Sequence, residues 1–231
     1  MKSIKAACVA ILAAGVMLTG CNSMTNTGKG ALIGGGGGGA LGAGIGALIG
    51  GGKGAGIGSA IGAAVGAGAG ALIGNRMDKQ AKELQEQLAN ADVERVEDQN
   101  GLAAIKVTFP GGILFPTNGT TLSASAQTEL SQFANSLKQN PNTNVQIYGF
   151  TDNTGTMAVN TRVSTGRADS VLSYLVQSGV APTRITAQGV PMADYVASND
   201  TAAGRAQNRR VEIYITADQQ MVQQAENGTL K

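Results

Sequence analysis

The sequence contains no histidine and no tryptophan, and cysteine occurs only twice in 231 residues. Without histidine the chain lacks the side chain used most often for acid–base catalysis and metal binding near neutral pH. No group of carboxylates has metal-ligand spacing, and no serine or threonine is accompanied by an evident base. The composition therefore argues against an enzyme, and we expect neither a metal site nor a cofactor.

The beginning of the chain has the pattern of an export signal. Two lysines precede an apolar run at residues 6–18, as in a secretory signal peptide. The run is too short to span a membrane, which takes about 20 apolar residues. It ends in LTGC, which resembles the lipobox of bacterial lipoproteins, where the cysteine is acylated and becomes the new N-terminus. We therefore assign residues 1–20 to a lipoprotein signal peptide and Cys21 to lipidation. An ordinary signal peptide with a chance cysteine is the alternative.

Removal of this signal changes the charge and cysteine content of the chain. The 17 basic residues fall to 15, because Lys2 and Lys5 are lost, and 15 acidic residues remain. Without a net positive charge there is no argument for a nucleic-acid partner. Cys21 is then the only cysteine, so no disulfide can form within one chain. Two or more acyl chains on Cys21 give a stable membrane anchor, and residues 21–29 become a lipidated tether. Asn22 follows the cysteine, where enteric lipoproteins retained in the inner membrane have aspartate, and this favours the outer membrane.

Glycine occupies every fourth position from Gly30 to Gly74, and the residues between are mainly Ala, Leu, Ile, Val and further glycines. This spacing places the glycines along one stripe of a helix, and small-residue stripes let membrane helices approach closely. Lys53 interrupts the segment near its middle. We therefore predict a membrane-associated helical hairpin, a glycine zipper, with arms at about residues 30–50 and 54–74. A weakly ordered spacer in the periplasm is the alternative.

The composition changes after this glycine-rich segment 30–74. Residues 75–92 are charged, with apolar residues at helical spacing, and predict an amphipathic linker helix. Residues 93–216 have the length and pattern of one small globular domain. The remaining residues, 217–231, are rich in glutamine and are interpreted as a polar tail.

Strands and helices alternate within the globular domain. The predicted strands are 93–96, 102–109, 113–115, 144–150, 184–190 and 209–215, and the predicted helices run from an N-cap at Ser123 to Leu137 and from about Asn160 to Ser178. The residues predicted to face the core are Leu130, Phe133, Ala134, Leu137, Ala168, Val171, Leu172, Leu175, Val176, Val211, Ile213 and Ile215. This order predicts an α+β fold, a two-layer βαβαβ sandwich with helices on one face of a small mixed sheet.

Three motifs in this domain carry a family resemblance. GFTDNTG (149–155), NTRVSTGRADSV (160–171) and GRAQNRRVEIYI (204–215) occur in the order and spacing of the OmpA-like peptidoglycan-binding domain. The resemblance covers about residues 103–216. With the glycine zipper and the lipobox, the whole chain resembles the YiaD-type outer-membrane lipoproteins. The family usually has G-H-T-D where this chain has Phe150, a change expected to affect local packing more than binding.

The resemblance implies a site for the diaminopimelate of a peptidoglycan stem peptide. The free end of that residue carries an ammonium and a carboxylate on one carbon, so its receptor needs one anion and one cation. By resemblance, Asp152 accepts the ammonium and Arg167 forms a two-pronged pair with the carboxylate. Asn160 and Thr151 contribute hydrogen bonds. The alternative is that Asp152 and Arg167 form only an ordinary surface ion pair with each other.

Two neighbouring segments have roles that the sequence leaves open. Asn208 and Arg209 either border the binding cleft, or Arg209 and Arg210 only mark the solvated start of the last strand. The loop after Phe115 lacks the acidic residue usual in the family, and we assign it a supporting role.

The sequence thus predicts an outer-membrane lipoprotein whose periplasmic domain binds peptidoglycan non-covalently, without cleaving it, and tethers the membrane to the cell wall. The expected partners are the stem peptide and the membrane, the latter through the lipid and through residues 30–74 if these insert. A homo-oligomer through the glycine zipper is also considered. The alternative function makes residues 30–74 the active part, a membrane oligomer serving as a pore or assembly factor, with the C-terminal domain only as an anchor.

Overall fold

The computed structural model describes residues 65–98, 100–116 and 118–230. The signal peptide, Cys21 and the glycine zipper up to residue 64 lie outside these residues. The helices are α2 (Ala67–Gln87), α3 (Gly111–Leu114), α4 (Ala124–Gln139), α5 (Met157–Gln177), η2 (Pro182–Arg184), α6 (Ala202–Asn208) and α7 (Gln219–Glu226). The strands are β1 (Asp92–Glu97), β2 (Ala103–Pro110), β3 (Thr143–Phe150), β4 (Ile185–Val190) and β5 (Arg210–Ala217).

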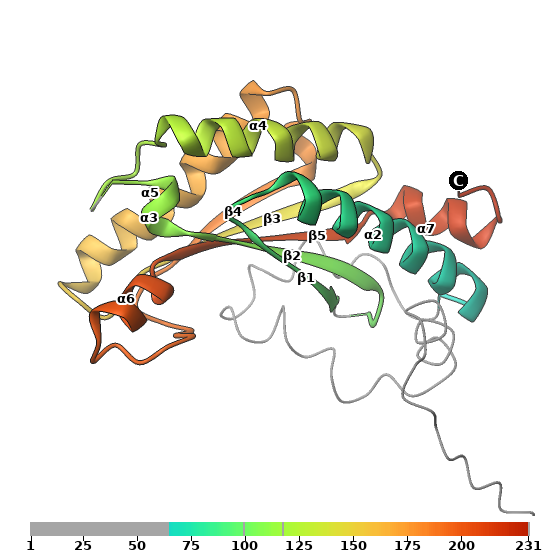
Figure 1. Cartoon of the computed structure of the whole chain (residues 1–231). Helices are drawn as coiled ribbons and strands as arrows, with labels where there is room; N and C mark the ends of the chain where they lie inside the picture. The colour runs from blue at the N-terminus through green and yellow to red at the C-terminus, as the bar shows by residue number, and fades with distance from the viewer. Residues whose placement is uncertain (1–64, 99, 117, 231) are drawn as a thin grey trace, which may run out of the picture.

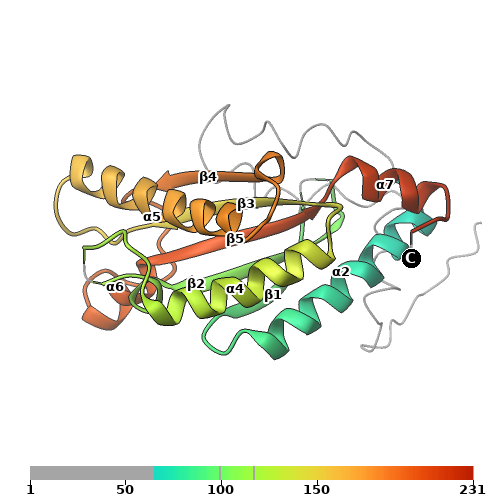
Figure 2. The ribbon, with the colours of Figure 1, turned by 90° about the horizontal axis from the view of Figure 1, so that it is seen from above.

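The five strands form one mixed sheet in the order β1-β2-β5-β3-β4. Strands β3 and β4 are parallel and the other neighbours are antiparallel. Helices α2, α4 and α5 lie side by side over one face of the sheet (Figures 1 and 2). Beneath them Phe109, Leu130, Phe133 and Ile213 are fully buried. The predicted α+β fold, with helices on one face of a mixed sheet, is confirmed.

The boundaries of the two long helices follow their caps. Ser123 accepts a hydrogen bond from Ala126 N and begins α4 at the predicted position. Thr156 caps α5 in the same way, so this helix begins three residues before the predicted start at Asn160. A threonine side chain can satisfy a free amide at a helix N-terminus, and this signal at Thr156 was missed.

Helix α2 differs from the predicted linker helix at residues 75–92. It begins at Ala67, inside the predicted glycine-rich segment, and continues without a break past Gly74 to Gln87. Its side chains Ile73, Met77 and Leu84 are at most 1% exposed. The helix packs over β1, β2 and α4, so it belongs to the core of the domain and is not a linker.

The residues after β5 also differ from the predicted polar tail. Asp218 caps α7, which places Met221, Val222 and Ala225 in the core against α2. The glutamines occupy the other positions of this short helix. The last helix and the first described helix therefore pack together (Figure 1).

The strand predicted at residues 113–115 is wrong. Residues Gly111–Leu114 form the short helix α3. The backbone partners of this segment come from outside the sheet: Gly111 N donates to Arg209 O at 2.7 Å, and Ser123 N donates to Leu114 O at 2.9 Å. An apolar run alone does not distinguish a strand from a buried helical turn.

Helix α5 lies unusually close to the parallel strands. Gly149 and Gly189 are register partners on β3 and β4. A Cβ atom at Gly149 would lie 2.3 Å from Ser164 O, and one at Gly189 would lie 2.5 Å from Thr165 N. Any larger residue would push α5 away from the sheet. These two glycines therefore set the distance between α5 and the strands β3 and β4.

No helix among the described residues combines the length and the apolar composition needed to cross a membrane.

The packing of α2 gives a first prediction. Replacement of Leu84 by alanine should lower the free energy of unfolding by about 2 to 5 kcal/mol, because it opens a cavity in the core. Glu86→Ala, at an exposed position of the same helix, is the matched control and should change stability by less than about 0.5 kcal/mol. Urea unfolding of the full chain measures both. Equal stability of the two variants would mean that α2 is a linker after all.

Candidate binding site around Asp152 and Arg167

Asp152 lies in the loop that joins β3 to α5, two residues after the strand ends. Its side chain is 5% exposed. Oδ1 accepts hydrogen bonds from the backbone amide of Thr154 at 2.9 Å and from its hydroxyl at 2.5 Å. Oδ2 accepts a hydrogen bond from Arg209 Nη1 at 2.5 Å, which makes an ion pair. The carboxylate is therefore held in place by groups on both sides.

These contacts decide the charge of Asp152. Burial raises the pKa of its carboxyl, but the two hydrogen bonds from Thr154 and the adjacent Arg209 guanidinium outweigh burial, so the pKa lies below its usual value. Hydrogen bonds and positive charge favour the ionised form. Asp152 is therefore an anion at neutral pH and a poor acceptor of a proton.

Arg167 comes from the third turn of α5 and is 3% exposed. Its Nε donates to Gly119 O at 3.1 Å, and its guanidinium lies 5.3 Å from the ring centroid of Phe115. Burial lowers the pKa of Arg167, the charge of Arg209 lowers it further, and the charge of Asp152 raises it. An arginine remains a cation despite such shifts. The loop after Phe115 thus contacts Arg167, as expected from its supporting role.

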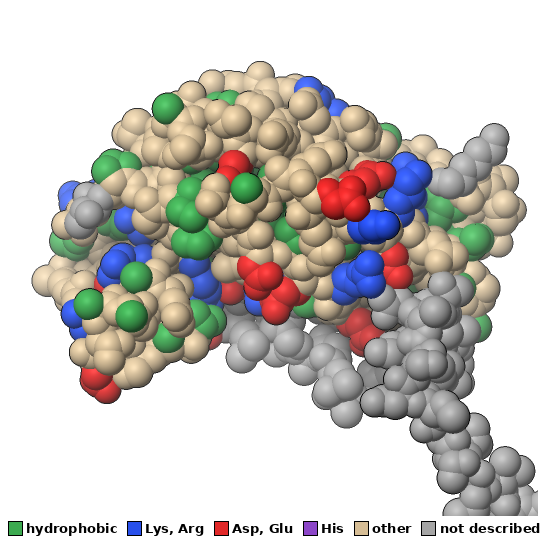
Figure 3. Space-filling model, in the orientation of Figure 1, with side chains coloured by type: hydrophobic (Ala, Val, Ile, Leu, Met, Phe, Trp, Pro, Cys, Tyr) green, Lys and Arg blue, Asp and Glu red, His purple; other side chains and the backbone are tan. Residues whose placement is uncertain are grey.

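Asp152 and Arg167 do not pair with each other. Among the described residues the ion-pair partner of Asp152 is Arg209, so the simple surface ion pair between the two predicted residues is not what the structure shows. The cluster contains one carboxylate and two guanidinium groups. Lys and Arg side chains gather at this end of the molecule, where α6 lies (Figures 1 and 3). The cluster therefore has an excess of positive charge.

The consecutive residues Arg209 and Arg210 have different roles: Arg209 follows α6, and Arg210 begins β5. The side chain of Arg209 is 40% exposed and reaches Asp152. Arg210 is only 4% exposed: its Nε donates to Glu212 at 2.7 Å, and its guanidinium stacks 3.9 Å from the centroid of Phe150. The interpretation of Arg210 as a solvated residue is wrong. The stacking also gives Phe150 a packing role, because an aromatic face attracts a cation.

The three other predicted residues hold loops in place. Asn160 Nδ2 donates to Thr154 O at 2.7 Å and thereby closes the Asp152 loop onto α5. Thr151 is buried, and its hydroxyl accepts from Met192 N at 3.0 Å. Asn208 is fully buried and bonds to both ends of the segment 196–199. In this structure these side chains act as positioning residues.

Sequence reasoning missed two residues of the site. Thr154 supplies two of the hydrogen bonds to Asp152, and a hydroxyl residue two positions after an aspartate could have indicated this turn. Asn199 accepts from the amide of Asn153 at 3.3 Å and from Asn208 Nδ2 at 2.9 Å, so it links the Asp152 loop to α6. Asn199 is 46 residues from Asn153, and no local pattern indicates such a contact.

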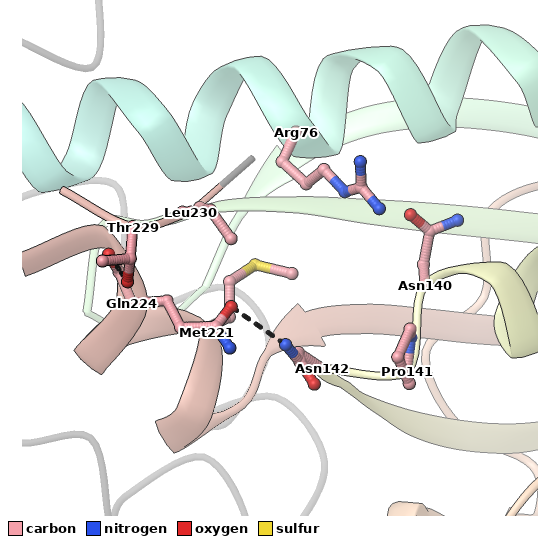
Figure 4. Close-up of a pocket in the computed structure, with 8 residues that line it drawn as sticks. All are labelled: Arg76, Asn140, Pro141, Asn142, Met221, Gln224, Thr229 and Leu230. Carbon is pink, nitrogen blue, oxygen red and sulfur yellow. Dashed lines mark hydrogen bonds between the residues drawn. The ribbon is translucent and has the colours of Figure 1, made fainter. Parts of the chain in front are cut away.

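A cavity lies at the end of the domain opposite the Asp152 loop, between α2, α7 and the turn from α4 to β3 (Figure 4). Its volume is about 370 Å³, and Arg76 is the one charged residue among those described that line it. Asn142 Nδ2 donates to Gln224 Oε1 at 3.1 Å on its rim. Without a carboxylate this cavity does not match a zwitterion. Among the described residues, no three His, Cys, Asp or Glu side chains are grouped as metal ligands.

Comparison with protein families agrees with the fold and the motifs. Residues 114–209 match the model of the OmpA family. This chain carries an OmpA-family domain. Residues 1–78 match the model of the YMGG-like Gly-zipper family, so the glycine pattern before the OmpA-family domain is also a family feature.

Similar proteins were found among both sequences and structures. The chain is 37% identical over 140 residues to the Escherichia coli (strain K12) protein "Probable lipoprotein YiaD", a match that covers 61% of this chain and 63% of that protein. It is 41% identical over 113 residues to the peptidoglycan-binding protein ArfA of Mycobacterium tuberculosis, covering 49% of this chain and 35% of ArfA. The cell wall anchor of the T6SS from Pseudomonas aeruginosa has a similar fold, with a TM-score of 0.52 and 29% identity over 62% of this chain and 98% of that one.

The lowered pKa of Asp152 predicts a pH dependence of stability. A carboxyl whose folded pKa is depressed contributes stability that is fully present above its unfolded pKa, about 3.9, and is lost as the pH falls through the lower folded value. We expect wild type to be more stable than Asp152→Asn by a constant margin from pH 7 to about pH 5, with the margin shrinking below about pH 4. Urea unfolding of both proteins between pH 7 and pH 2 measures this difference in stability. A margin that does not change with pH would contradict the assignment.

Proposed function

We propose that this chain is an outer-membrane lipoprotein whose OmpA-family domain binds the diaminopimelate end of a peptidoglycan stem peptide and so tethers the membrane to the cell wall. The observation that carries the proposal is the buried cluster itself. Asp152 and Arg167 are each about 95% buried or more and both charged, yet they do not neutralise each other. Burying a charge without an opposite charge beside it is costly. Among the described residues Arg167 has no ion-pair partner, and a ligand carboxylate would supply one, while the ligand ammonium would replace Arg209 at Asp152.

The chemistry of the ligand fits the cluster residue by residue. The ammonium of the diaminopimelate end binds the Asp152 carboxylate, and its carboxylate binds the Arg167 guanidinium through charge-assisted hydrogen bonds. In the absence of ligand, Arg209 forms the ion pair with Asp152. Because the Arg209 side chain is 40% exposed, it can turn aside when the ammonium arrives and then pair with a carboxylate of the ligand.

The relatives support binding rather than catalysis. ArfA is named as a peptidoglycan-binding protein, and its similarity to this chain lies over 113 residues. Within the site, Asp152 has a lowered pKa, which makes it a weak general base. We therefore propose that the stem peptide is held and not cleaved. The other candidate, an oligomeric pore built from residues 30–74, is not favoured by these relatives, and self-association through the glycine zipper remains a separate proposal.

The positions of the site and of the N-terminal segment suit a tether. The start of α2 and helix α7 lie at one end of the domain, and α6 with the start of α5 lies at the other (Figures 1 and 2). A chain anchored through Cys21 enters the domain at α2 and presents the ligand site at the far end. One stem peptide would bind only modestly, and the anchor would add effective concentration at a polymer with many identical ends.

The clamp gives a direct prediction. Asp152→Ala and Arg167→Ala should each weaken binding to purified cell-wall sacculi by about tenfold or more, because each loses a charge-assisted hydrogen bond and leaves a ligand charge unpaired. Arg167→Lys should fall between wild type and alanine, because lysine keeps the charge but loses the planar fork. The measurement is sedimentation of the full-length protein in detergent with sacculi, with free meso-diaminopimelate as competitor.

The control for this experiment follows from the structure. Arg210 is unsuitable, because it is buried and packed on Phe150. Arg162 is an exposed arginine on the same helix as Arg167, so Arg162→Ala removes an equal charge without touching the cluster. If Arg162→Ala loses as much binding as Arg167→Ala, the contact is general electrostatic attraction and the clamp is wrong.

The proposed anchor is tested separately. Cys21→Ala should leave an unprocessed precursor that incorporates no labelled palmitate, because the thiol that receives the lipid is absent. The chain should then leave the outer-membrane fraction. Labelled palmitate in the variant is detected by autoradiography. Normal incorporation would exclude Cys21 as the lipidated residue.

A further inference from the structure

Large apolar side chains are exposed at only a few positions of the described chain, and these positions are not scattered. They are Met157, Val159, Tyr195 and Val196, with 56%, 44%, 41% and 58% of their surface exposed. Two begin α5, directly after the Asp152 loop, and two lie in the segment before α6 that Asn208 holds. Exposed apolar residues that gather in one place mark an interaction surface.

The segment that carries Tyr195 and Val196 is fixed by buried side chains. The fully buried Asn208 accepts hydrogen bonds from Val196 N at 2.9 Å and Ala197 N at 3.0 Å. On the other side of Tyr195, the buried Arg210 donates to Asp194 O at 3.0 Å. Asp194 has a φ of 51°, a conformation that costs energy for a residue other than glycine. The surrounding contacts therefore maintain the exposure of Tyr195 against a strained backbone.

The segment that carries Tyr195 is also joined to the Asp152 loop. Asn208 holds this segment at Val196 N, and Asn199 accepts hydrogen bonds from Asn208 Nδ2 and from Asn153 N. The pKa of the Tyr195 hydroxyl is raised by partial burial and by the negative charge of Asp152. On the opposite side, Val159 N donates to the Thr156 hydroxyl, and Asn160 joins the same turn to Thr154, the residue that holds Asp152. Both apolar pairs are thus attached to the loops that shape the site.

We infer that Met157, Val159, Tyr195 and Val196 form an apolar rim, which packs against the hydrocarbon of the stem peptide on either side of its zwitterionic centre. This inference rests on the proposed function. Both halves of the rim are held by residues that also hold the Asp152 loop, so an occupant that reaches both the cluster and the rim carries a zwitterion and short aliphatic groups together. The diaminopimelate end of a stem peptide has both, in its methylene chain and in the methyl group of the adjoining alanine. The charges would select the zwitterion, and the rim would distinguish a stem peptide from a small free amino acid.

The test uses the full-length protein in detergent and a purified disaccharide-tetrapeptide that contains meso-diaminopimelate. Two double variants, Met157→Ser with Val159→Ser and Tyr195→Ser with Val196→Ser, remove the two halves of the rim. Each should weaken binding about three- to tenfold, because apolar contact area is lost. Each should also make the heat-capacity change of binding less negative, since that change reports buried apolar surface. Isothermal titration at several temperatures measures both quantities.

The controls separate the rim from the clamp and from the fold. Tyr195→Phe keeps the ring and loses the hydroxyl, so it should bind within about twofold of wild type. Circular dichroism should show that all rim variants remain folded, because the side chains changed in them are exposed. The inference is overturned if the double variants bind the tetrapeptide like wild type while Asp152→Ala does not. It is also overturned if the affinity of the double variants falls without a change in the heat capacity of binding. A loss of affinity in Tyr195→Phe as large as in the serine variants would overturn it as well. If Asp152→Ala and Arg167→Ala also bind like wild type, the proposed function itself fails.

Discussion

Helix α5 can approach strands β3 and β4 closely only because Gly149 and Gly189 have no side chains beneath it. The rest of the site depends on this contact. Asp152 follows β3 and Arg167 lies on α5, so the distance from the helix to the sheet sets the distance between the two charges. A methyl group at either glycine would collide with the backbone of α5, at Ser164 O or Thr165 N. The geometry of the proposed binding site is therefore determined by packing that involves none of the proposed ligand-binding residues.

The arrangement of Arg167 and Arg209 around Asp152 keeps two opposite charges buried without pairing Asp152 with Arg167, so both charges can still interact with a ligand. If Asp152 and Arg167 paired directly, a ligand would have to break a buried ion pair, which is costly. Here Asp152 is satisfied by Thr154 and by the half-exposed Arg209, while Arg167 rests on Gly119 O and the Phe115 ring. Ligand binding would then break only the Arg209–Asp152 ion pair, which is the one nearest to solvent. An ion pair contributes least to stability where it is exposed to solvent.

Sequence patterns predicted those parts of the structure that local periodicity controls. The core face of α4, the alternating inward residues of β5 and the N-cap at Ser123 are of this kind. The errors occur where contacts with residues distant in the sequence determine the local structure. Gly111–Leu114 forms a helical turn because its backbone partners are Arg209 and Ser123. The glutamine-rich α7 is ordered by its packing on α2. Within the site, the motifs indicated Asp152 and Arg167, whereas the Arg209 contact and the Asn199 link join residues 57 and 46 positions apart and could not be read locally.

The packing of α2 and α7 changes the mechanical interpretation of the protein. A flexible linker before the domain would let the binding site point in any direction. Instead, α2 is part of the core, and α7 packs against it at the end of the sheet away from the proposed ligand site (Figure 1). Force applied to the chain before Ala67 would enter the domain through the buried Ile73, Met77 and Leu84, and the sheet would carry it to the Asp152 loop. In β3 and β5, which run antiparallel side by side along this direction, the hydrogen bonds resist sliding as a group. In the proposed tether, a load would therefore act on packed helices and paired strands between the start of α2 and the Asp152 loop.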